Sequence, residues 1–210
     1  MPDDTRTAAV ARALLKAGTV TLTPDEPVTF KSGLRSPVYV DNRRLIFQPG
    51  PWRIVIDAFA AALPPGESVL AGVESAGIPH SSALAFSVGL PSVFVRKAAK
   101  EHGLGRRIEG GDVAGQRTIL VEDMVTTGGS SLSAVEALRE AGAAVADCFA
   151  IITYGFSEAL EAFDAAGVTL TTLTTFESVV AEALTAGTVD EREAELVRSW
   201  LSDPHAWDDR

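Results

Sequence analysis

Residues 118–143 read TILVEDMVTTGGSSLSAVEALREAGA, and this stretch decides how the rest of the chain is interpreted. An apolar run ends in two adjacent acids, Glu122 and Asp123, and a turn of threonine, glycine and serine follows before a helical pattern begins. Carboxylates repel phosphate, whereas the free N–H groups at the start of a helix attract it. A ligand that suits both halves of the stretch must therefore carry hydroxyl groups as well as a phosphate.

Strand-like and helix-like patterns alternate on either side of this stretch, with short connections between them. Alternation of this kind predicts βαβ units and an α/β fold with a central parallel sheet flanked by helices. The last helix is expected to start at Thr188, because Glu191 stands at the spacing of a capping box. The expected strands lie at residues 28–33, 36–41, 68–73, 91–97, 117–123, 144–154 and 168–175, and the expected helices at 5–18, 51–63, 78–89, 130–142 and 157–167, with two more closing the chain.

The composition limits the classes of function. The chain has 210 residues, of which 46% are hydrophobic, and its formal net charge is −10, which suits one ordinary α/β domain. The acidic balance argues against a general nucleic-acid or membrane-surface protein, because both need broad basic patches. Without a signal peptide or an apolar span of membrane length, the expected compartment is the cytoplasm. Cys148, the only cysteine, stands in an apolar run and is expected to be a buried thiol.

The turn at residues 126–130 is expected to bind an anion. It would lie at the carboxyl end of a parallel strand, where such sheets bind ligands, and Gly128 and Gly129 would allow close approach. Ser130 and Ser131 are candidates to cap the helix that follows. The turn lacks both the lysine of a Walker loop and the spacing of a dinucleotide fingerprint. A phosphorylated pentose fits the acids and the turn together, and an ordinary acidic turn is the alternative.

The strand, the two acids and the threonine-glycine turn together resemble the 5-phosphoribosyl-1-pyrophosphate (PRPP) motif of type I phosphoribosyltransferases. The resemblance implies that the acids hold the ribose hydroxyls and that the turn holds the 5′-phosphate. It also implies a single domain over residues 1–210, with a small N-terminal hood over about residues 1–45. The PRPP-binding residues implied in this stretch are Glu122, Asp123, Met124, Val125, Thr126, Thr127, Gly128, Gly129 and Ser130.

A second stretch, VRKAAKEHGLGRR at residues 95–107, concentrates positive charge in an acidic chain. Pyrophosphate would need such partners, although a solvated charged loop is the alternative. The stretch resembles the catalytic loop of orotate phosphoribosyltransferases, which reaches the neighbouring subunit of a homodimer. The resemblance implies that Arg96, Lys97, Lys100 and His102 bind PRPP through its pyrophosphate, and that Arg96, Lys100 and His102 are catalytic.

Two more stretches carry the resemblance. Residues 30–44, FKSGLRSPVYVDNRR, match the family's N-terminal segment and imply that Lys31 and Tyr39 contact orotate, together with Thr126 of the turn. Residues 72–85, GVESAGIPHSSALA, match the loop that receives pyrophosphate on its main chain, where Gly72 and Gly77 would permit close approach. Some relatives place an arginine near residue 154 to hold the orotate carboxylate, whereas this chain has a tyrosine, so that partner stays open.

The resemblance implies transfer of the 5-phosphoribosyl group from PRPP to orotate, giving orotidine 5′-monophosphate and pyrophosphate in de novo UMP biosynthesis. Mg²⁺ is implied as the cofactor, held mainly by the substrate and water rather than by protein side chains. The implied partners are the two substrates and a second copy of the chain. Two alternatives remain: a phosphoribosyltransferase for another base, and a PRPP-sensing regulator that binds nucleic acid without catalysis.

Overall fold

The computed structural model describes residues 4–29, 35–98, 107–204 and 207. The chain divides into two compact units, one made of Met1–Ile54 and Thr174–Arg210, the other of Val55–Leu173. The N-terminal segment that the sequence suggested as a hood thus belongs to a unit that also takes in the C-terminal helices. Lys31, Lys100 and His102 lie outside the described residues.

The unit Val55–Leu173 is built on a six-stranded sheet with the order β10-β9-β8-β5-β6-β7. All neighbouring strands are parallel except β6 and β7, so the predicted central parallel sheet is confirmed. The short β7 falls where the sequence suggested only a charged loop. The strands are β5 (Val69–Val73), β6 (Ser92–Val95), β7 (Ile108–Glu109), β8 (Arg117–Val125), β9 (Ala144–Thr153) and β10 (Thr169–Thr172).

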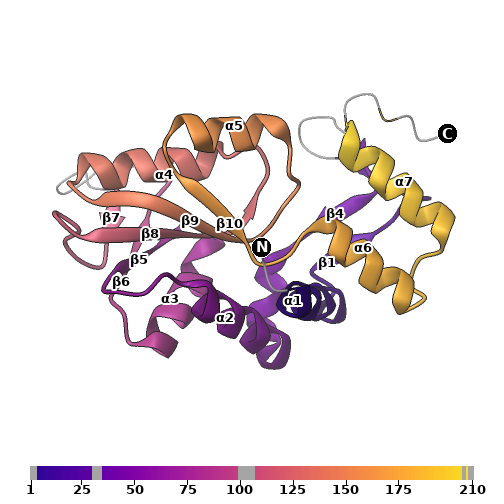
Figure 1. Cartoon of the computed structure of the whole chain (residues 1–210), viewed down its shortest axis with the longest axis horizontal. Helices are drawn as coiled ribbons and strands as arrows, with labels where there is room; N and C mark the ends of the chain where they lie inside the picture. The colour runs from indigo at the N-terminus through magenta and orange to yellow at the C-terminus, as the bar shows by residue number, and fades with distance from the viewer. Residues whose placement is uncertain (1–3, 30–34, 99–106, 205–206, 208–210) are drawn as a thin grey trace. The chain divides into compact units, whose positions relative to one another are not determined.

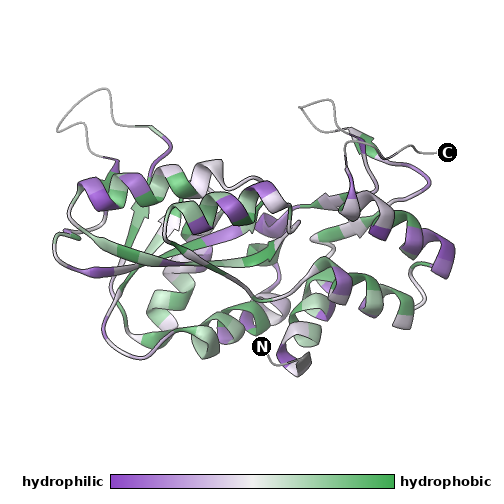
Figure 2. Ribbon diagram, turned by 45° about the horizontal axis from the view of Figure 1, so that its top comes forward, coloured by the Kyte–Doolittle hydropathy of each residue, from purple (hydrophilic) through white to green (hydrophobic). Residues whose placement is uncertain are grey.

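Helices cover both faces of this sheet. Figure 1 shows α4 and α5 on one face and α3 on the other. The strands are mostly hydrophobic, whereas the helices carry hydrophilic residues as well, as Figure 2 shows. Every residue of β5 is buried, as expected of a parallel strand covered on both sides. The helices are α2 (Pro49–Ala62), which starts in the other unit, α3 (Gly77–Val88), α4 (Gly129–Glu140) and α5 (Ser157–Ala165).

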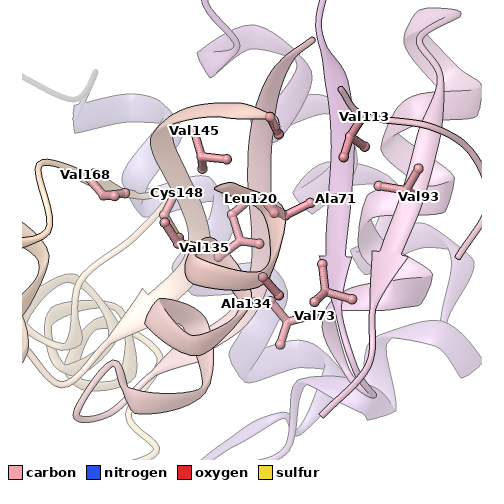
Figure 3. Packing of buried hydrophobic residues seen from close by; sticks show 14 of the residues in the cluster. Ala71, Val73, Val93, Val113, Leu120, Ala134, Val135, Val145, Cys148 and Val168 are labelled. Atoms are coloured by element: carbon pink, nitrogen blue, oxygen red, sulfur yellow. The ribbon is translucent and has the colours of Figure 1, made fainter. Parts of the chain in front are cut away.

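One hydrophobic cluster of this unit lies between the central strands and the helices α4 and α5. Leu120, Val135 and Cys148 are almost fully buried and belong to one cluster, shown in Figure 3. The predicted burial of the Cys148 thiol is therefore confirmed. Gly142 follows α4 with φ +87, as a helix-ending glycine does.

The other unit joins the two ends of the chain. Trp200 of the last helix is fully buried, and its Nε1 donates a hydrogen bond of 2.9 Å to the carbonyl oxygen of Arg35. Strand β1 pairs antiparallel with β4, and β2 pairs antiparallel with β3. The elements are α1 (Asp4–Ala17), β1 (Val20–Leu22), β2 (Val28–Thr29), β3 (Arg35–Ser36), β4 (Val38–Val40), the 3₁₀ helix η1 (Asn42–Phe47), α6 (Phe176–Thr185) and α7 (Glu191–Ser202).

The start of α7 corrects the sequence interpretation. Asp190, not Thr188, caps the helix: its carboxylate accepts from the N–H of Glu193 at 2.8 Å, and the Glu193 carboxylate accepts from the N–H of Asp190 at 2.8 Å. The predicted capping box exists but lies two residues later, because the Thr188 hydroxyl donates instead to the carbonyl oxygen of Ala183. No helix in the described residues is long and apolar enough to cross a bilayer.

Candidate anion site at the carboxyl edge of the sheet

The two acids of the opening stretch lie near the carboxyl end of β8, which continues two residues beyond them to Val125. Their environments differ, because Glu122 is 5% exposed whereas Asp123 is half-buried. In a parallel sheet the loops beyond this edge are where ligands bind. The side chain of Asp123 is therefore partly accessible at this edge, whereas that of Glu122 is enclosed by the protein.

The Glu122 carboxylate contacts the first turn of α4. The hydroxyls of Ser130 and Ser131 donate to its Oε1 at 3.3 and 3.4 Å, and the N–H of Asp123 donates to Oε2 at 3.3 Å. Burial, and then the negative charge of Asp123, raise the pKa of Glu122 to about 8. The protonated carboxyl therefore predominates at pH 7 in the unliganded protein.

These contacts show that the expected capping of α4 by Ser130 or Ser131 is wrong. The N-cap residue is Gly128, which has φ +84 and no side chain to accept from the helix. The serine hydroxyls are directed to Glu122 instead, because the buried carboxylate lies within their reach. The first N–H groups of α4 consequently lack a side-chain acceptor and remain available to an anion.

The two glycines of the turn have different surroundings. A Cβ added to Gly128 would lie 3.0 Å from the ring of Phe163 in α5, and its positive φ is strained for other residues. A Cβ added to Gly129 would meet no atom within 4 Å, and its φ is not positive. Only Gly128 is therefore required by the backbone and by packing, whereas Gly129 leaves open space in front of the helix start.

Gly72 and Gly77 bring α3 close to the sheet. A Cβ on Gly72 would lie 2.4 Å from Ser81 Oγ, and a Cβ on Gly77 would lie 2.5 Å from the carbonyl oxygen of Val121. Both glycines are thus needed for packing between α3 and the strands. Their predicted part in the approach of an anion stays a prediction.

Two basic residues follow β6 beside the start of α4. The N–H of Arg96 donates to the carbonyl oxygen of Arg107 at 2.8 Å, and the N–H of Lys97 donates to Glu74 Oε2 at 2.8 Å. Arg96 Nη1 lies 3.7 Å from Glu109 Oε1 and makes no hydrogen bond within the described residues. Arg96 Nη1 could therefore donate a hydrogen bond to a bound anion.

A small cavity joins these basic residues to the helix start. Its volume is about 170 Å³, and the structure thus brings Arg96 and Lys97 together with Ser130, as the sequence implied. Arg107, which is distinguished in the sequence only by its positive charge, lines the same space. The lining residues are Val73, Val95, Arg96, Lys97, Arg107, Ser130, Ser133 and Ala134.

The residues expected around the aromatic base are placed separately. Thr126 is half-buried in the turn after β8. Tyr39 lies on β4 in the other unit, where its side chain is 42% exposed, which leaves the ring available for contact. Tyr154, which stands where some relatives have an arginine, is buried and stacks on Phe156 with ring centroids 5.3 Å apart.

Two described side chains with acid-base or nucleophilic chemistry, those of His80 and Cys148, are fully buried. Burial lowers the pKa of His80 to about 4, so the imidazole is neutral at pH 7. Burial, together with the charge of Glu122, raises the pKa of the Cys148 thiol. Among the described residues, no three His, Cys, Asp or Glu side chains form a group that could hold a metal ion.

The chain is similar to known proteins over most of its length. Residues 55–184 match the family model of the phosphoribosyl transferase domain. Over 201 residues the chain is 41% identical to the orotate phosphoribosyltransferase of Bacillus caldolyticus, with 94% of this chain and 97% of that protein covered.

Two solved structures extend the likeness to the fold. The orotate phosphoribosyltransferase of Aeropyrum pernix superposes with a TM-score of 0.72 at 27% identity and covers 86% of this chain and 99% of its own. That of Mycobacterium tuberculosis H37Rv in complex with PRPP has a TM-score of 0.65 at 26% identity, with 82% of this chain and 98% of its own covered. The likeness therefore extends far beyond the motifs of the site.

Proposed function

Because the chain belongs to the orotate phosphoribosyltransferases, we propose that it transfers the 5-phosphoribosyl group of PRPP to orotate, giving orotidine 5′-monophosphate and pyrophosphate in de novo UMP biosynthesis. The observation that carries this proposal is one arrangement at the edge of the sheet. The uncapped start of α4 lies beside Arg96 and Lys97, with the carboxylates of Glu122 and Asp123 at the strand that precedes it. Phosphate, ribose and pyrophosphate each find the matching chemistry there.

The start of α4 would hold the 5′-phosphate. Its first N–H groups have no capping side chain, and the helix dipole adds a partial positive charge at the same point. Gly129 leaves room for phosphate oxygens to approach the backbone. The half-buried carboxylate of Asp123 would accept from the ribose hydroxyls, and Glu122 would join it once ligand binding favours its ionised form. Met124 and Val125 would line the ribose from the end of β8.

The basic residues would stabilise the leaving group. As N1 of orotate forms its bond to C1 of the ribose, the bond from C1 to pyrophosphate breaks, and its electron pair leaves with the pyrophosphate oxygen. The proton of N1 passes to water or to the departing pyrophosphate. Arg96 has a donor without a hydrogen-bond partner in the described chain, and Lys97 is exposed, so both can meet the growing charge. Lys100 and His102 would complete this set. Catalysis would then rest on positioning and electrostatic stabilisation.

Mg²⁺ would be the cofactor, and the donors of the site suit it. The described residues contain no dedicated protein cage, so PRPP oxygens and water would supply most of its ligands, with the Asp123 carboxylate as a hard oxygen nearby. The bound ion would neutralise charge on the pyrophosphate. The chain's own part is to orient the ribose and the phosphate around it.

The orotate ring would be contacted by Lys31, Tyr39 and Thr126. The exposed ring of Tyr39 offers an apolar face for stacking, which supports this assignment. We further propose a cytoplasmic homodimer in which Lys100 and His102 of one chain serve the site of the other, whereas Arg96 and Lys97 stay beside the start of α4 in their own chain.

The proposal is tested by ultraviolet monitoring of orotate with PRPP and Mg²⁺, with the base varied across orotate, uracil, adenine and hypoxanthine. We expect orotate to be consumed and pyrophosphate to be released, with no comparable turnover of the other bases. Turnover of a different base would show another specificity within the family. Binding of PRPP without turnover of any base, together with salt-dependent binding of nucleic acid, would instead indicate a regulator.

A further inference from the structure

We infer that Arg107 is a positioning residue: its guanidinium ties the end of β6 to the first turns of α4, and so sets where Arg96 and Lys97 stand relative to the 5′-phosphate site. This inference rests on the proposed function, because it assigns those two residues to the pyrophosphate. Arg107 itself is not assigned to the substrate. Its action is through the two residues that it holds.

The contacts of Arg107 run in two directions. Its Nε donates to the carbonyl oxygen of Arg96 at 2.9 Å, and its Nη1 donates to both the carbonyl oxygen and the Oγ of Ser133, each at 3.1 Å. Ser133 lies in α4, in the same cavity lining as Ser130. One side chain thus bridges the strand end that carries the basic residues and the helix whose start would hold the phosphate.

The backbone around this bridge is fixed from both sides. The N–H of Arg96 donates to the carbonyl oxygen of Arg107 at 2.8 Å, so the backbone and the side chain of Arg107 hold the same residue. The N–H of Lys97 is held by Glu74, which comes directly after β5. Residues 96 and 97 are therefore connected to three neighbouring elements, and Arg107 supplies the only one of these connections that reaches α4.

Arginine is chemically required for this bridge. A guanidinium presents donors in a rigid planar fork, so one group can serve two acceptors that lie in different directions. A lysine would keep the positive charge but has a single nitrogen on a flexible stem, which cannot hold both carbonyl oxygens in this arrangement. Replacement by lysine consequently removes the bridge but keeps the positive charge, whereas replacement by glutamine removes both.

The experiment compares R107Q and R107K with the wild-type protein in the reverse reaction, from orotidine 5′-monophosphate and pyrophosphate. We expect both variants to raise the KM for pyrophosphate about 10-fold, because charge-assisted hydrogen bonds that position its partners are lost. The KM for orotidine 5′-monophosphate should stay within about 2-fold, because the start of α4 remains folded. Hydrogen exchange of the unliganded proteins should be faster in a peptide over residues 94–98 in both variants.

Two matched controls accompany these variants. R117Q removes an arginine that also donates to a main-chain oxygen, that of Pro65, and to Asp147, away from the cavity. S133A removes the Oγ acceptor but leaves the carbonyl oxygen that Arg107 also binds. Both should keep the wild-type KM for pyrophosphate within about 2-fold and leave exchange over residues 94–98 unchanged.

The outcomes distinguish a bridging role of Arg107 from an effect of its charge alone and from a general structural role. Wild-type KM values in R107K with a raised KM in R107Q would show that charge alone matters, and would overturn the inference. Equal increases in both KM values, with a lowered melting temperature, would reduce Arg107 to a general structural residue and also overturn it. If the wild-type protein itself shows no transfer to orotate, the proposed function fails, and the exchange rates alone decide whether Arg107 forms the bridge.

Discussion

The acid-glycine turn after β8 and the basic residues after β6 serve one proposed ligand but are built in different ways. In the first, residues 122–131 are contiguous, and the strand end, the turn and the helix start are set by local geometry. In the second, Arg96 and Lys97 are held by Glu74, which lies 23 residues before Lys97, and by Arg107, which is itself bonded to Ser133 of α4. The proposed phosphate binding would thus be a local property of one βα unit, whereas the proposed pyrophosphate binding would depend on how three such units pack.

The largest expected effect lies in the basic stretch. Lys100→Ala should lower kcat by about 100-fold or more, because it removes a positive charge that would stabilise the negative charge of the departing pyrophosphate. The melting temperature should stay unchanged. Lys16→Ala, which removes a lysine from the last turn of α1, is the matched control and should leave kcat unaltered. Steady-state kinetics and thermal melts measure both, and wild-type turnover in the Lys100 variant would remove this residue from the leaving-group site.

The turn is tested by a pair of glycine replacements. Gly128→Ala should destabilise the fold by about 2 kcal/mol, because alanine is strained at φ +84 and its Cβ would press on Phe163. Gly129→Ala should change stability by less than about 0.5 kcal/mol, because its Cβ meets only open space. Urea unfolding measures the difference. Equal stability of the two variants would contradict the strict local geometry assigned to the turn.

The buried acid of the turn should give the unliganded protein a pH dependence. The pKa of Glu122 is raised in the folded state to about 8 from an ordinary value of 4.5, so between these values the folded chain binds the extra proton. The contribution of this group to stability is therefore fully present below pH 4.5 and is lost as the pH rises through about 8, at no more than about 1.4 kcal/mol per pH unit.

Glu122→Gln removes that titration and serves as the comparison. Urea unfolding between pH 5 and pH 8 should show a steeper fall in stability for the wild-type protein than for the variant. Parallel curves for the two proteins would mean that the carboxyl is not held in its neutral form by burial.

The smallest expected effect is a partial recovery of activity in mixed dimers. It tests whether each site combines the acid-glycine turn of one chain with Lys100 of the other. Mixing a Lys100→Ala subunit with an Asp123→Ala subunit should restore about a quarter of the wild-type activity, because half of the dimers are mixed and each has one intact site. Each variant alone should be nearly inactive. An absence of recovery after confirmed subunit exchange would assign both regions to the same chain.

The long elements of the fold could be predicted from the sequence, whereas the shortest ones could not. The parallel sheet, its covering helices and the burial of Cys148 were predictable, because periodicity and apolar runs report local structure and burial. The two-residue β7 and the three-residue β1 were missed, because strands this short carry no periodic signal. η1 was missed as well, since its residues resemble a loop.

Within the site, the predictions from sequence were wrong or silent where a side chain forms its hydrogen bond with another element. Ser130 and Ser131 are suitable caps by type, but a buried carboxylate from the preceding strand accepts their hydroxyls. Arg107 was visible as one more basic residue, yet its bond to Ser133 depends on the packing of α4 beside β6. Such choices become definite only when the elements are assembled in space.

The absent cap of α4 makes the unliganded enzyme incomplete in a literal sense. A capping side chain at position 128 is excluded by the φ of +84 and by the ring of Phe163, so the first amides of α4 stay without a side-chain acceptor. The phosphate proposed to bind there would supply the acceptor that the helix start lacks. PRPP would then finish the folding of the helix that binds it, and the occupied enzyme would be the more fully folded form.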